Sequence, residues 1–317
     1  MPQEELRQNF IKYNLKPTIR ENREVLDMFS NFLVMAVKNH HNDPVDNDAD
    51  AQAKLILQMM LTKTLHLRSL ANGIEFVAND GTILNNIIDP TIVAISIRNI
   101  FETAATFNLI YRTSKAGDEK TITYLLWVIA GLSYRQRFES NIVSQEIRDK
   151  YEFEKKEIQR LTNEIEQTNL FQALDAKNKQ RIRNLIKQKS YHVKFENNKA
   201  LSLAWYELIP VMGIRRGLFD NIYTYFSLYT HPSNVSVFQF GEMFENEQKP
   251  FLELTNFNLN YATSFLSIFL ADYLNVFPAV KESFNQLSLL EQIILDYPNK
   301  FARGDEYSIN DSWKALG

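Results

Sequence analysis

The sequence predicts an all-α protein, built as a single multi-helix bundle domain with a projecting charged helical hairpin and at most a minor β-hairpin. Glycine and proline, which interrupt regular structure, are scarce at nine residues each. Apolar residues mostly recur at helical rather than alternating spacing, which is typical of amphipathic helices. The chain has 317 residues, 45% of them hydrophobic, so it can bury a substantial core. Length alone would allow one large or two medium domains.

Four helices are expected in the first half of the chain, over residues 18–39, 51–71, 90–112 and 118–139. The first follows Pro17, and the second stops near Gly73, because glycine commonly ends a helix. Pro90 suits the first turn of the third helix. Before that helix, Asp80-Gly81 lies between β-favouring residues, which predicts a short hairpin.

The segment from 144 to 190 differs from the rest. It is dense in charge, and its few apolar residues form narrow stripes at helical spacing. Two antiparallel helices projecting from the body explain this pattern. The second half could contact phosphate; the alternative is a solvated face balanced by the acidic first half. Its basic residues are Lys177, Lys179, Arg181, Arg183, Lys187 and Lys189.

The helical body resumes after residue 190. We expect a helix that ends near residue 231, a loop over 231–250, and two last helices over 256–277 and 283–296. The predicted division of the chain is 1–143 as the N-terminal half of the body, 144–190 as the hairpin, 191–297 as the C-terminal half and 298–317 as a tail.

Composition excludes several classes of protein. The formal net charge is −3, from 35 basic and 38 acidic residues, so no global field draws the chain to nucleic acid or anionic lipid. There is no cysteine, which excludes disulfides and thiolate sites and fits a reducing compartment. The apolar stretches are too short or too interrupted to span a membrane, and the N-terminus has no signal-peptide core. We expect a soluble, cytoplasmic protein; the oligomeric state stays open.

The metal and cofactor motifs fail. Three alternating aspartates from Asp46 imitate the start of an EF-hand loop, but Ala51 and Leu57 stand where the turn glycine and the bidentate glutamate belong. His40 and His41 are adjacent and point in different directions, so a surface loop is expected there. No phosphate-binding glycine loop or nucleophile elbow occurs. We therefore expect no cofactor and no metal.

Arg98 and Glu102 are the first candidate site residues. They lie one turn apart in the helix expected over 90–112, opposite a continuous apolar arc. As an exposed pair they would stabilise the helix by only about 0.2–0.5 kcal/mol. If the pair is partly buried, removing one partner could cost about 3–5 kcal/mol. The pattern is thus compatible with a structural clamp and with a functional dyad.

Tyr223, Ser227 and His231 are the second set of candidates. They follow one another four residues apart on the polar side of one helix. His231 precedes Pro232 and should end that helix, because the residue before proline avoids the α region. The helix dipole favours a protonated imidazole there, and the group could serve as general acid or base. The same spacing also fits the polar face of an ordinary amphipathic helix.

The stretch RNIFETAATFNLIYR, followed far downstream by YTYFSLYTHPSN, resembles a large family of uncharacterised bacterial all-helical domains. In that family an Arg-x-x-x-Glu helix is paired with a Tyr-x-x-x-Ser-x-x-x-His helix end. The resemblance covers about residues 20–275, and the family implies no established reaction. It implies that the following side chains meet where two helices face each other: Arg98, Glu102, Tyr223, Ser227 and His231.

A more distant likeness is to the HEPN domains, helical bundles of bacterial defence systems and toxins. Those domains often cleave RNA with an arginine followed a few residues later by a histidine. This chain departs from that pattern, because no arginine precedes any of its five histidines by four to six residues. The same chemistry would need Arg98 or Arg216 to reach His231 through the fold.

Two functions stay open. In the first, the chain acts on RNA or a nucleotide in a defence or toxin-type system, with His231 as acid or base, Arg98 stabilising an anion and Glu102 orienting one of them. In the second, the chain is a non-catalytic protein–protein interaction module, the same residues form a polar clamp, and the segment 144–190 binds the partner. A buried, fully bonded cluster would favour the clamp, and a cluster open to a pocket would favour the enzyme.

Overall fold

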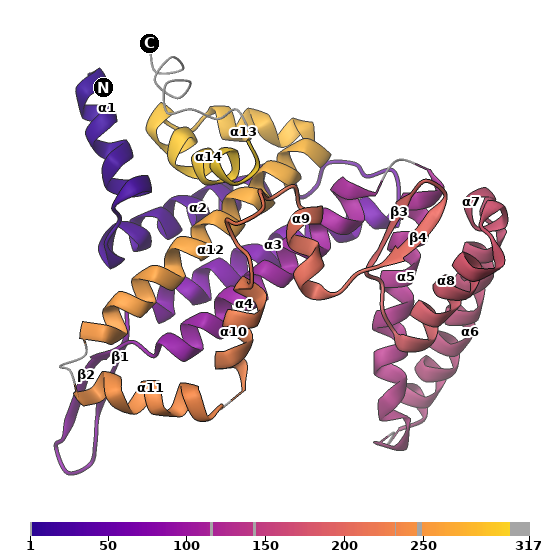
Figure 1. Cartoon of the computed structure of the whole chain (residues 1–317), viewed down its shortest axis with the longest axis horizontal. Coiled ribbons are helices and arrows are strands. Elements are labelled where there is room, and N and C mark those ends of the chain that lie inside the picture. The colour runs from indigo at the N-terminus through magenta and orange to yellow at the C-terminus, as the bar shows by residue number, and fades with distance from the viewer. Residues whose placement is uncertain (1, 115–116, 142–143, 232, 246–248, 305–317) are drawn as a thin grey trace. The chain divides into compact units, whose positions relative to one another are not determined.

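The computed structural model describes residues 2–114, 117–141, 144–231, 233–245 and 249–304 (Figure 1). Helices dominate these ranges, and the strands found there form two separate two-stranded antiparallel sheets. The predicted all-α class with minor β-hairpins is confirmed. The chain divides into two compact units: unit 1 comprises residues 1–108 and 212–317, and unit 2 comprises residues 109–211.

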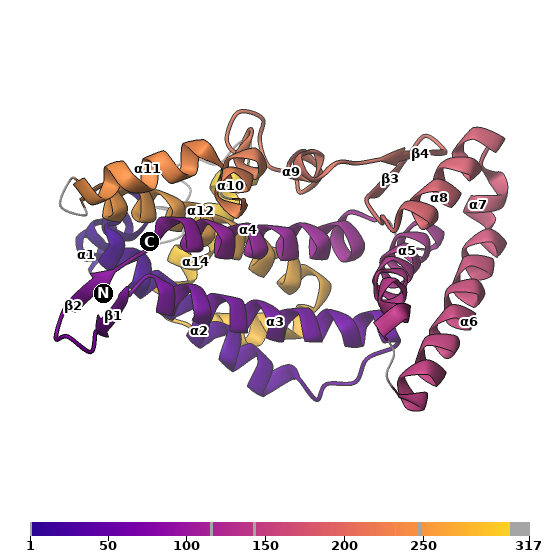
Figure 2. The same ribbon diagram turned by 90° about the horizontal axis from the view of Figure 1, so that it is seen from below.

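Unit 1 is assembled from both ends of the chain. Its first part contains α1 (Gln3–Phe10), the π-helical turn η1 (Ile11–Leu15), α2 (Ile19–His40), α3 (Asp48–Leu70), β1 (Ile74–Val77), β2 (Ile83–Ile87) and α4 (Pro90–Phe107). Its second part contains α10 (Ile222–Thr230), α11 (Asn234–Glu245), α12 (Lys249–Val276), η5 (Pro278–Val280), α13 (Lys281–Asn285) and α14 (Leu289–Arg303). The central helix is α12, which packs on α2, α4 and α14, while α10 packs on α4. Figure 2 shows α2, α3 and α4 side by side.

The core between α4 and α12 is aromatic. The rings of Phe107 and Phe269 meet edge-on with centroids 5.1 Å apart, and those of Phe101 and Phe265 lie 5.0 Å apart. All four side chains are at most 1% exposed. Because burial of one phenylalanine contributes about 1.5–3 kcal/mol, this contact is a main source of the stability of unit 1.

The start of α4 is fixed by its capping residues. Asp89 Oδ1 accepts hydrogen bonds from the backbone N–H groups of Thr91 (2.8 Å) and Ile92 (3.4 Å), and Pro90 occupies the first turn as predicted. A cap of this kind stabilises a helix by about 1 kcal/mol. Arg98 and Glu102, four residues apart, lie one turn apart on this helix.

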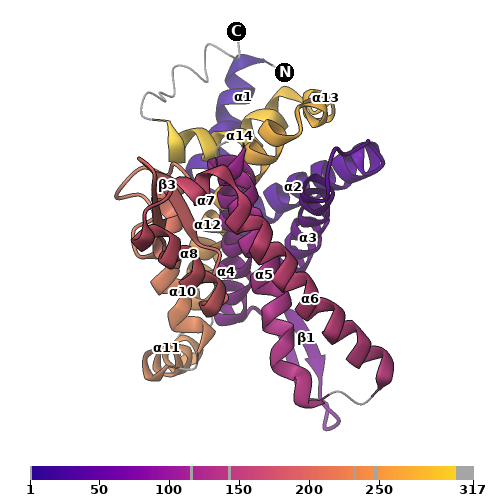
Figure 3. The same cartoon turned by 90° about the vertical axis from the view of Figure 1, so that its right-hand side faces the viewer.

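Unit 2 is built on α5 (Asp118–Arg135). Its other elements are η2 (Asn108–Thr113), η3 (Gln136–Asn141), α6 (Gln145–Gln167), α7 (Asn169–Ala173), α8 (Ala176–Gln188), β3 (Val193–Glu196), β4 (Lys199–Ser202), η4 (Trp205–Glu207) and α9 (Leu208–Val211). Figure 3 shows α6 running alongside α5. Buried residues of α5, α6, α8, β3 and β4 form one core, which includes Ile129, Leu161, Ile165, Ile182 and Leu185.

The two long helices predicted within 144–190 are present as α6 and α8. Their narrow apolar stripes pack with α5 in the core of unit 2. Asn178 on α8 is 4% exposed, and its Oδ1 accepts the backbone N–H of Ala200 on β4 at 3.1 Å. The segment therefore belongs to a compact unit that also includes residues 109–143 and 191–211.

The second half of unit 1 differs from the expected elements. Helix α11 occupies residues 234–245, where a loop was expected, and α12 begins at Lys249 rather than near residue 256. Helix α14 runs to Arg303, past the predicted end at residue 296 and past Pro298. The rest of the predicted tail, residues 305–317, lies outside the described residues.

Ser267 of α12 explains why α14 continues through Pro298. Proline lacks the N–H that a helix needs and clashes with the preceding turn, so it normally ends or kinks a helix. Here the Ser267 hydroxyl, 1% exposed, donates to the Leu295 carbonyl at 2.5 Å and accepts the Asn299 N–H at 2.9 Å. In a regular helix these two backbone groups bond each other, so the hydroxyl supports both of them on either side of Pro298.

A buried ion pair joins α12 to α14. Arg303 Nη1 and Nη2 donate to Asp272 Oδ1 at 2.7 Å and Oδ2 at 2.8 Å, and the Asp272 side chain is 1% exposed. Asn108 Nδ2 donates to Asp272 Oδ2 at 2.8 Å, and Arg303 Nε donates to the Met212 carbonyl at 2.7 Å. Asn108 is the last residue of the first segment of unit 1, and Met212 is the first residue of its second segment. The network therefore fixes the ends of both segments.

Hydropathy gives one observation about membranes. No single helix in the described ranges has the length and apolar character to cross a bilayer. The pair formed by α12 and residues 278–285, bent by 117°, is together long and apolar enough to do so. Much of α12 is buried inside unit 1.

His192 is a buried titratable group in unit 2. Its side chain is 7% exposed and lies edge-on to the rings of Tyr191 (4.5 Å) and Trp205 (4.4 Å). Within the described residues, its Nε2 has no hydrogen-bond partner. Burial lowers the pKa of His192 from 6.5 to about 4, because the charged imidazolium is poorly solvated there.

We expect Arg303→Met to lower the free energy of unfolding by about 3–5 kcal/mol, because it leaves the buried Asp272 carboxylate without its cation. Lys300→Met is the matched control: Lys300 lies on the same helix in an exposed pair with Asp296 and should cost less than about 1 kcal/mol. Urea denaturation measures both. Equal losses would contradict the importance assigned to the buried pair.

Acid should weaken unit 2 through His192. The folded-state pKa, about 4, lies below the unfolded value of 6.5, so the contribution of neutral His192 is complete above pH 6.5 and is lost as pH falls to about 4. The total loss is about 3 kcal/mol. The protection factors of the β3 and β4 amides, which correct hydrogen-exchange rates for their intrinsic pH dependence, should fall over this window in the wild type.

The matched variant is His192→Phe, which keeps a ring between Tyr191 and Trp205 and removes the titration. Its protection factors should depend much less on pH over the same window. His66→Phe, at an exposed position of α3, should retain the wild-type dependence. An unchanged dependence in His192→Phe would contradict the assignment.

Candidate functional site

Helix α10 positions three of the five candidate residues. It is preceded by Asn221 in the left-handed conformation (φ 63°), which asparagine tolerates better than most residues. It ends at Thr230, and His231 has extended backbone angles (φ −118°, ψ 138°). This end agrees with the prediction from the following proline. The apolar side of α10, including Phe226 at 0% exposed, is buried.

Arg98 of α4 binds the polar side of α10. Its Nη2 donates to Tyr223 Oη at 2.6 Å, and its Nη1 donates to Thr230 Oγ1 at 3.0 Å. Its Nε donates to Glu102 Oε1 at 2.8 Å within α4. The Arg98 and Glu102 side chains are 19% and 27% exposed, so the pair is partly buried. Each nitrogen of the guanidinium thus has a partner inside unit 1.

Tyr223 contacts Arg98 through its ring as well as its hydroxyl. The Arg98 Cζ lies 4.6 Å from the centroid of the Tyr223 ring, within the range of a cation–π interaction. The ring also lies 6.2 Å from that of Phe101. Burial raises the pKa of Tyr223, with the Arg98 charge opposing this shift, so the phenol stays protonated at neutral pH. Tyr223 therefore acts as a neutral hydrogen-bonding group.

Ser227 and His231 do not join this network. Ser227 Oγ donates to the Tyr223 carbonyl at 2.7 Å, a bond inside α10 that helical serines commonly make. His231 is exposed, and in the part of the chain that the structure describes no hydrogen bond or ion pair links its ring to Arg98, Glu102 or Tyr223. Of the five predicted residues, the structure brings three together: Arg98, Glu102 and Tyr223.

Two members of the cluster were missed by the sequence analysis. Thr230 follows Tyr223 by seven residues, so helical periodicity places both on one face, and this signal was available. Lys63 of α3 donates to Thr103 Oγ1 and lies near Glu102. Burial lowers the pKa of Lys63, and the Glu102 charge opposes that shift. No sequence pattern joins Lys63 to α4, because only the packing of α3 on α4 brings them together.

Two of the cavities that the described residues form lie in unit 2, and none of the five candidate residues lines them. One, of about 350 Å³, is lined by residues that include Ser114, Glu119 and Lys194. The other, of about 400 Å³, lies on the basic helix α8 and includes Lys177, Arg181 and Gln188. Arg181 also donates to the Ala200 carbonyl, so part of its charge is used inside the unit.

We expect Arg98→Met to lower the free energy of unfolding by about 2–3 kcal/mol, because it removes three hydrogen bonds and the cation beside the partly buried Glu102. Ser227→Ala, on the same face of α10, should change it by less than about 0.5 kcal/mol. Thermal denaturation of both variants checks this. A stable Arg98→Met protein would contradict a structural role for the cluster.

Comparison with known proteins finds no relative of this chain. No protein-family model matches the chain, no curated protein matches it, and no solved structure matches it. Among the described residues, no group of three or more histidine, cysteine, aspartate or glutamate side chains is placed to hold a metal ion. The chemistry of the cluster therefore rests on its own geometry: a partly buried arginine that joins α4 to α10 through a tyrosine and a threonine.

Proposed function

We propose that this chain is a non-catalytic helical module for protein–protein interaction, in which the Arg98 cluster is a polar clamp. The observation that carries the proposal is that all three guanidinium nitrogens of Arg98 bond to groups of unit 1. A catalytic arginine must have donors directed at a substrate, whereas these hold α10 against α4. Among the described residues, no hydrogen bond or ion pair joins His231 to this cluster, which supports the same conclusion.

The hairpin β1–β2 is the surface that we assign to the partner. Phe76 pairs with Leu84, and Val77 pairs with Ile83 at the next position, so the two pairs lie on opposite faces. These side chains are between 45% and 60% exposed. Figures 1 and 2 show the hairpin extending away from the helices around it. A two-stranded hairpin is marginally stable alone, and apolar side chains on both faces favour cover by another protein.

Charge narrows the kind of partner. Between Arg68 and Arg98 the sequence contains no lysine or arginine, whereas Glu75, Asp80 and Asp89 are acidic. The hairpin thus combines apolar faces with negative charge, which suits an apolar strand or groove flanked by basic residues. The outer faces of α6 and α8 offer a second, charged surface. The absence of cysteine supports a reducing compartment such as the cytoplasm.

Action on RNA or a nucleotide, as in a defence or toxin-type system, is the second candidate function. One observation favours it: Thr230, a partner of Arg98, is the neighbour of the exposed His231, so an imidazole lies close in the chain to a partly exposed guanidinium. In this scheme His231 moves the proton and Arg98 binds the phosphate, and an acid–base role of this kind contributes about 10²–10⁴-fold in rate.

The two candidates predict different results for one set of variants. A photo-crosslinking residue at position 76 should capture one discrete protein in the native cell, and the same residue at Val34, an exposed apolar position on α2, should not. With that partner purified, Phe76→Ser combined with Ile83→Ser should weaken binding by about tenfold or more, because each exchange removes an apolar contact. His231→Ala should bind normally.

Cleavage assays on RNA and on nucleotides complete the test. Wild-type protein without activity, together with hairpin-dependent binding, supports the interaction module. Turnover by the wild type that His231→Ala abolishes without loss of stability would replace it with the enzyme. Binding that survives both hairpin substitutions would remove the hairpin from the interface.

A further inference from the structure

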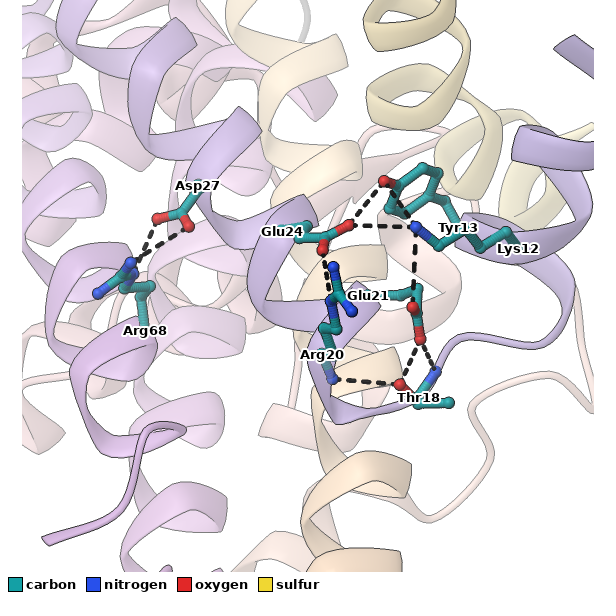
Figure 4. A network of polar contacts seen from close by, with 8 residues as sticks. All are labelled: Lys12, Tyr13, Thr18, Arg20, Glu21, Glu24, Asp27 and Arg68. Carbon is teal, nitrogen blue, oxygen red and sulfur yellow. Dashed lines mark hydrogen bonds and ion pairs between the residues drawn. The ribbon is translucent and has the colours of Figure 1, made fainter. Parts of the chain in front are cut away.

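Several basic and acidic side chains form ion pairs around the first turns of α2. Lys12 lies 3.8 Å from Glu21 and 3.4 Å from Glu24, and Arg20 lies 3.0 Å from Glu24. Separately, Arg68 of α3 lies 2.8 Å from Asp27. Figure 4 shows these contacts, together with the Tyr13 hydroxyl that donates to Glu24 at 2.6 Å. Three cations thus face three carboxylates, and the group is neutral.

Arg23 is a cation in the same region that has no ion-pair partner among the described residues. It lies on α2 one turn before Asp27, and it is partly buried. Its Nε is buried without a hydrogen-bond partner, and no carboxylate lies within ion-pair distance of it among the residues that the structure describes. By contrast, Arg20, Arg68 and Arg98 each have an acidic partner.

A second cation makes the surroundings of Arg23 less favourable still. Burial lowers the pKa of Arg23, and the nearby Arg68 charge lowers it further. Arginine remains charged at any physiological pH, so proton loss cannot relieve this cost. Partly buried charges are ordinarily paired, and here the missing charge is negative.

We propose that Arg23 and Arg68 bind a phosphate-type oxyanion on unit 1. Arg68 Nε and Nη2 donate to the Asp27 carboxylate at 2.8 Å and 3.3 Å. Among the described residues, this leaves the Arg68 Nη1 without a partner. The Arg23 guanidinium has no ion-pair partner among the described residues, and its Nε is buried without a hydrogen bond. Arg23, Arg68 and Asp27 together carry a charge of +1, which an anion can offset.

Chemistry and access both suit a phosphate group. Planar guanidinium forks donate pairs of hydrogen bonds to phosphate oxygens, and such charge-assisted bonds are about twice as strong as neutral ones. The Arg68 side chain is 42% exposed and that of Asp27 is 46% exposed, so an anion can approach from solvent. Inorganic phosphate and the phosphate of a nucleotide share this chemistry. The site uses none of the five candidate residues of the Arg98 cluster.

The test uses the full chain and two phosphate probes. Isothermal titration of the wild type with inorganic phosphate should show one site, and phosphate at about 20 mM should raise the melting temperature above that in sodium chloride of equal ionic strength. In Arg23→Gln the affinity should fall by about tenfold or more. In phosphate-free buffer this variant should be at least as stable as the wild type, because it removes an unpaired cation.

Arg20→Gln is the matched control, since Arg20 lies on the same helix, is 81% exposed and is paired with Glu24. It should keep the wild-type response to phosphate. A response that Arg23→Gln retains, or that Arg20→Gln loses equally, would show general electrostatics and overturn the site, as would a wild type that binds no phosphate. If Arg23→Gln does not fold, Arg23→Lys, which keeps the charge and loses the fork, should bind more weakly than the wild type.

Titration with AMP and with adenosine identifies the source of the phosphate. Tighter binding of AMP than of inorganic phosphate indicates a nucleotide, and equal binding indicates that the phosphate group alone is recognised. Adenosine should not bind in either case; adenosine binding as tight as that of AMP would contradict recognition through the phosphate.

Discussion

Unit 1 depends on the buried pair between Asp272 and Arg303. The unit is made from two segments of chain separated by the whole of unit 2, and its core must close across that interruption. The pair joins α12 to α14, and its members also bond Asn108, where the first segment ends, and Met212, where the second begins. A buried pair is favourable only when its remaining donors and acceptors are satisfied. Here the bonds that satisfy them are the same bonds that fix the ends of both segments.

The Arg98 cluster repeats this arrangement on a smaller scale and nearer the surface. One cation from α4 binds the side chains of Tyr223 and Thr230, two turns apart on α10. Because α10 has only nine residues, its own hydrogen bonds would not keep it helical in water. Its stability comes from apolar packing on one side and from Arg98 on the other. Both polar networks therefore attach short or late segments of the chain to the long central helices.

Local signals predicted the first four helices well, and contacts between distant residues explain some of the errors. The Asp89-Pro90 start of α4 and the turn at Gly81 depend on residues next to each other, so the sequence contains all the information needed. The turn between β3 and β4 has Asn197 and Asn198 with positive φ (49° and 57°), a weaker signal than one with glycine. The extension of α14 past Pro298 could not be predicted, since it depends on Ser267 of another helix. The site shows the same division. The polar patches on two helices predicted that Arg98 would meet Tyr223, whereas the position of Lys63 near Glu102 depends on how α3 packs on α4.

The hydroxyl bridge of Ser267 couples two positions that are far apart in sequence. Serine is useful at 267 because proline occupies 298, and proline is tolerated at 298 because serine occupies 267. If an alanine replaced the proline, the Asn299 N–H and the Leu295 carbonyl could bond each other directly, and a small apolar residue at 267 would then fit the core. The two positions should thus vary together among relatives, so that serine at 267 accompanies proline at 298 and disappears with it.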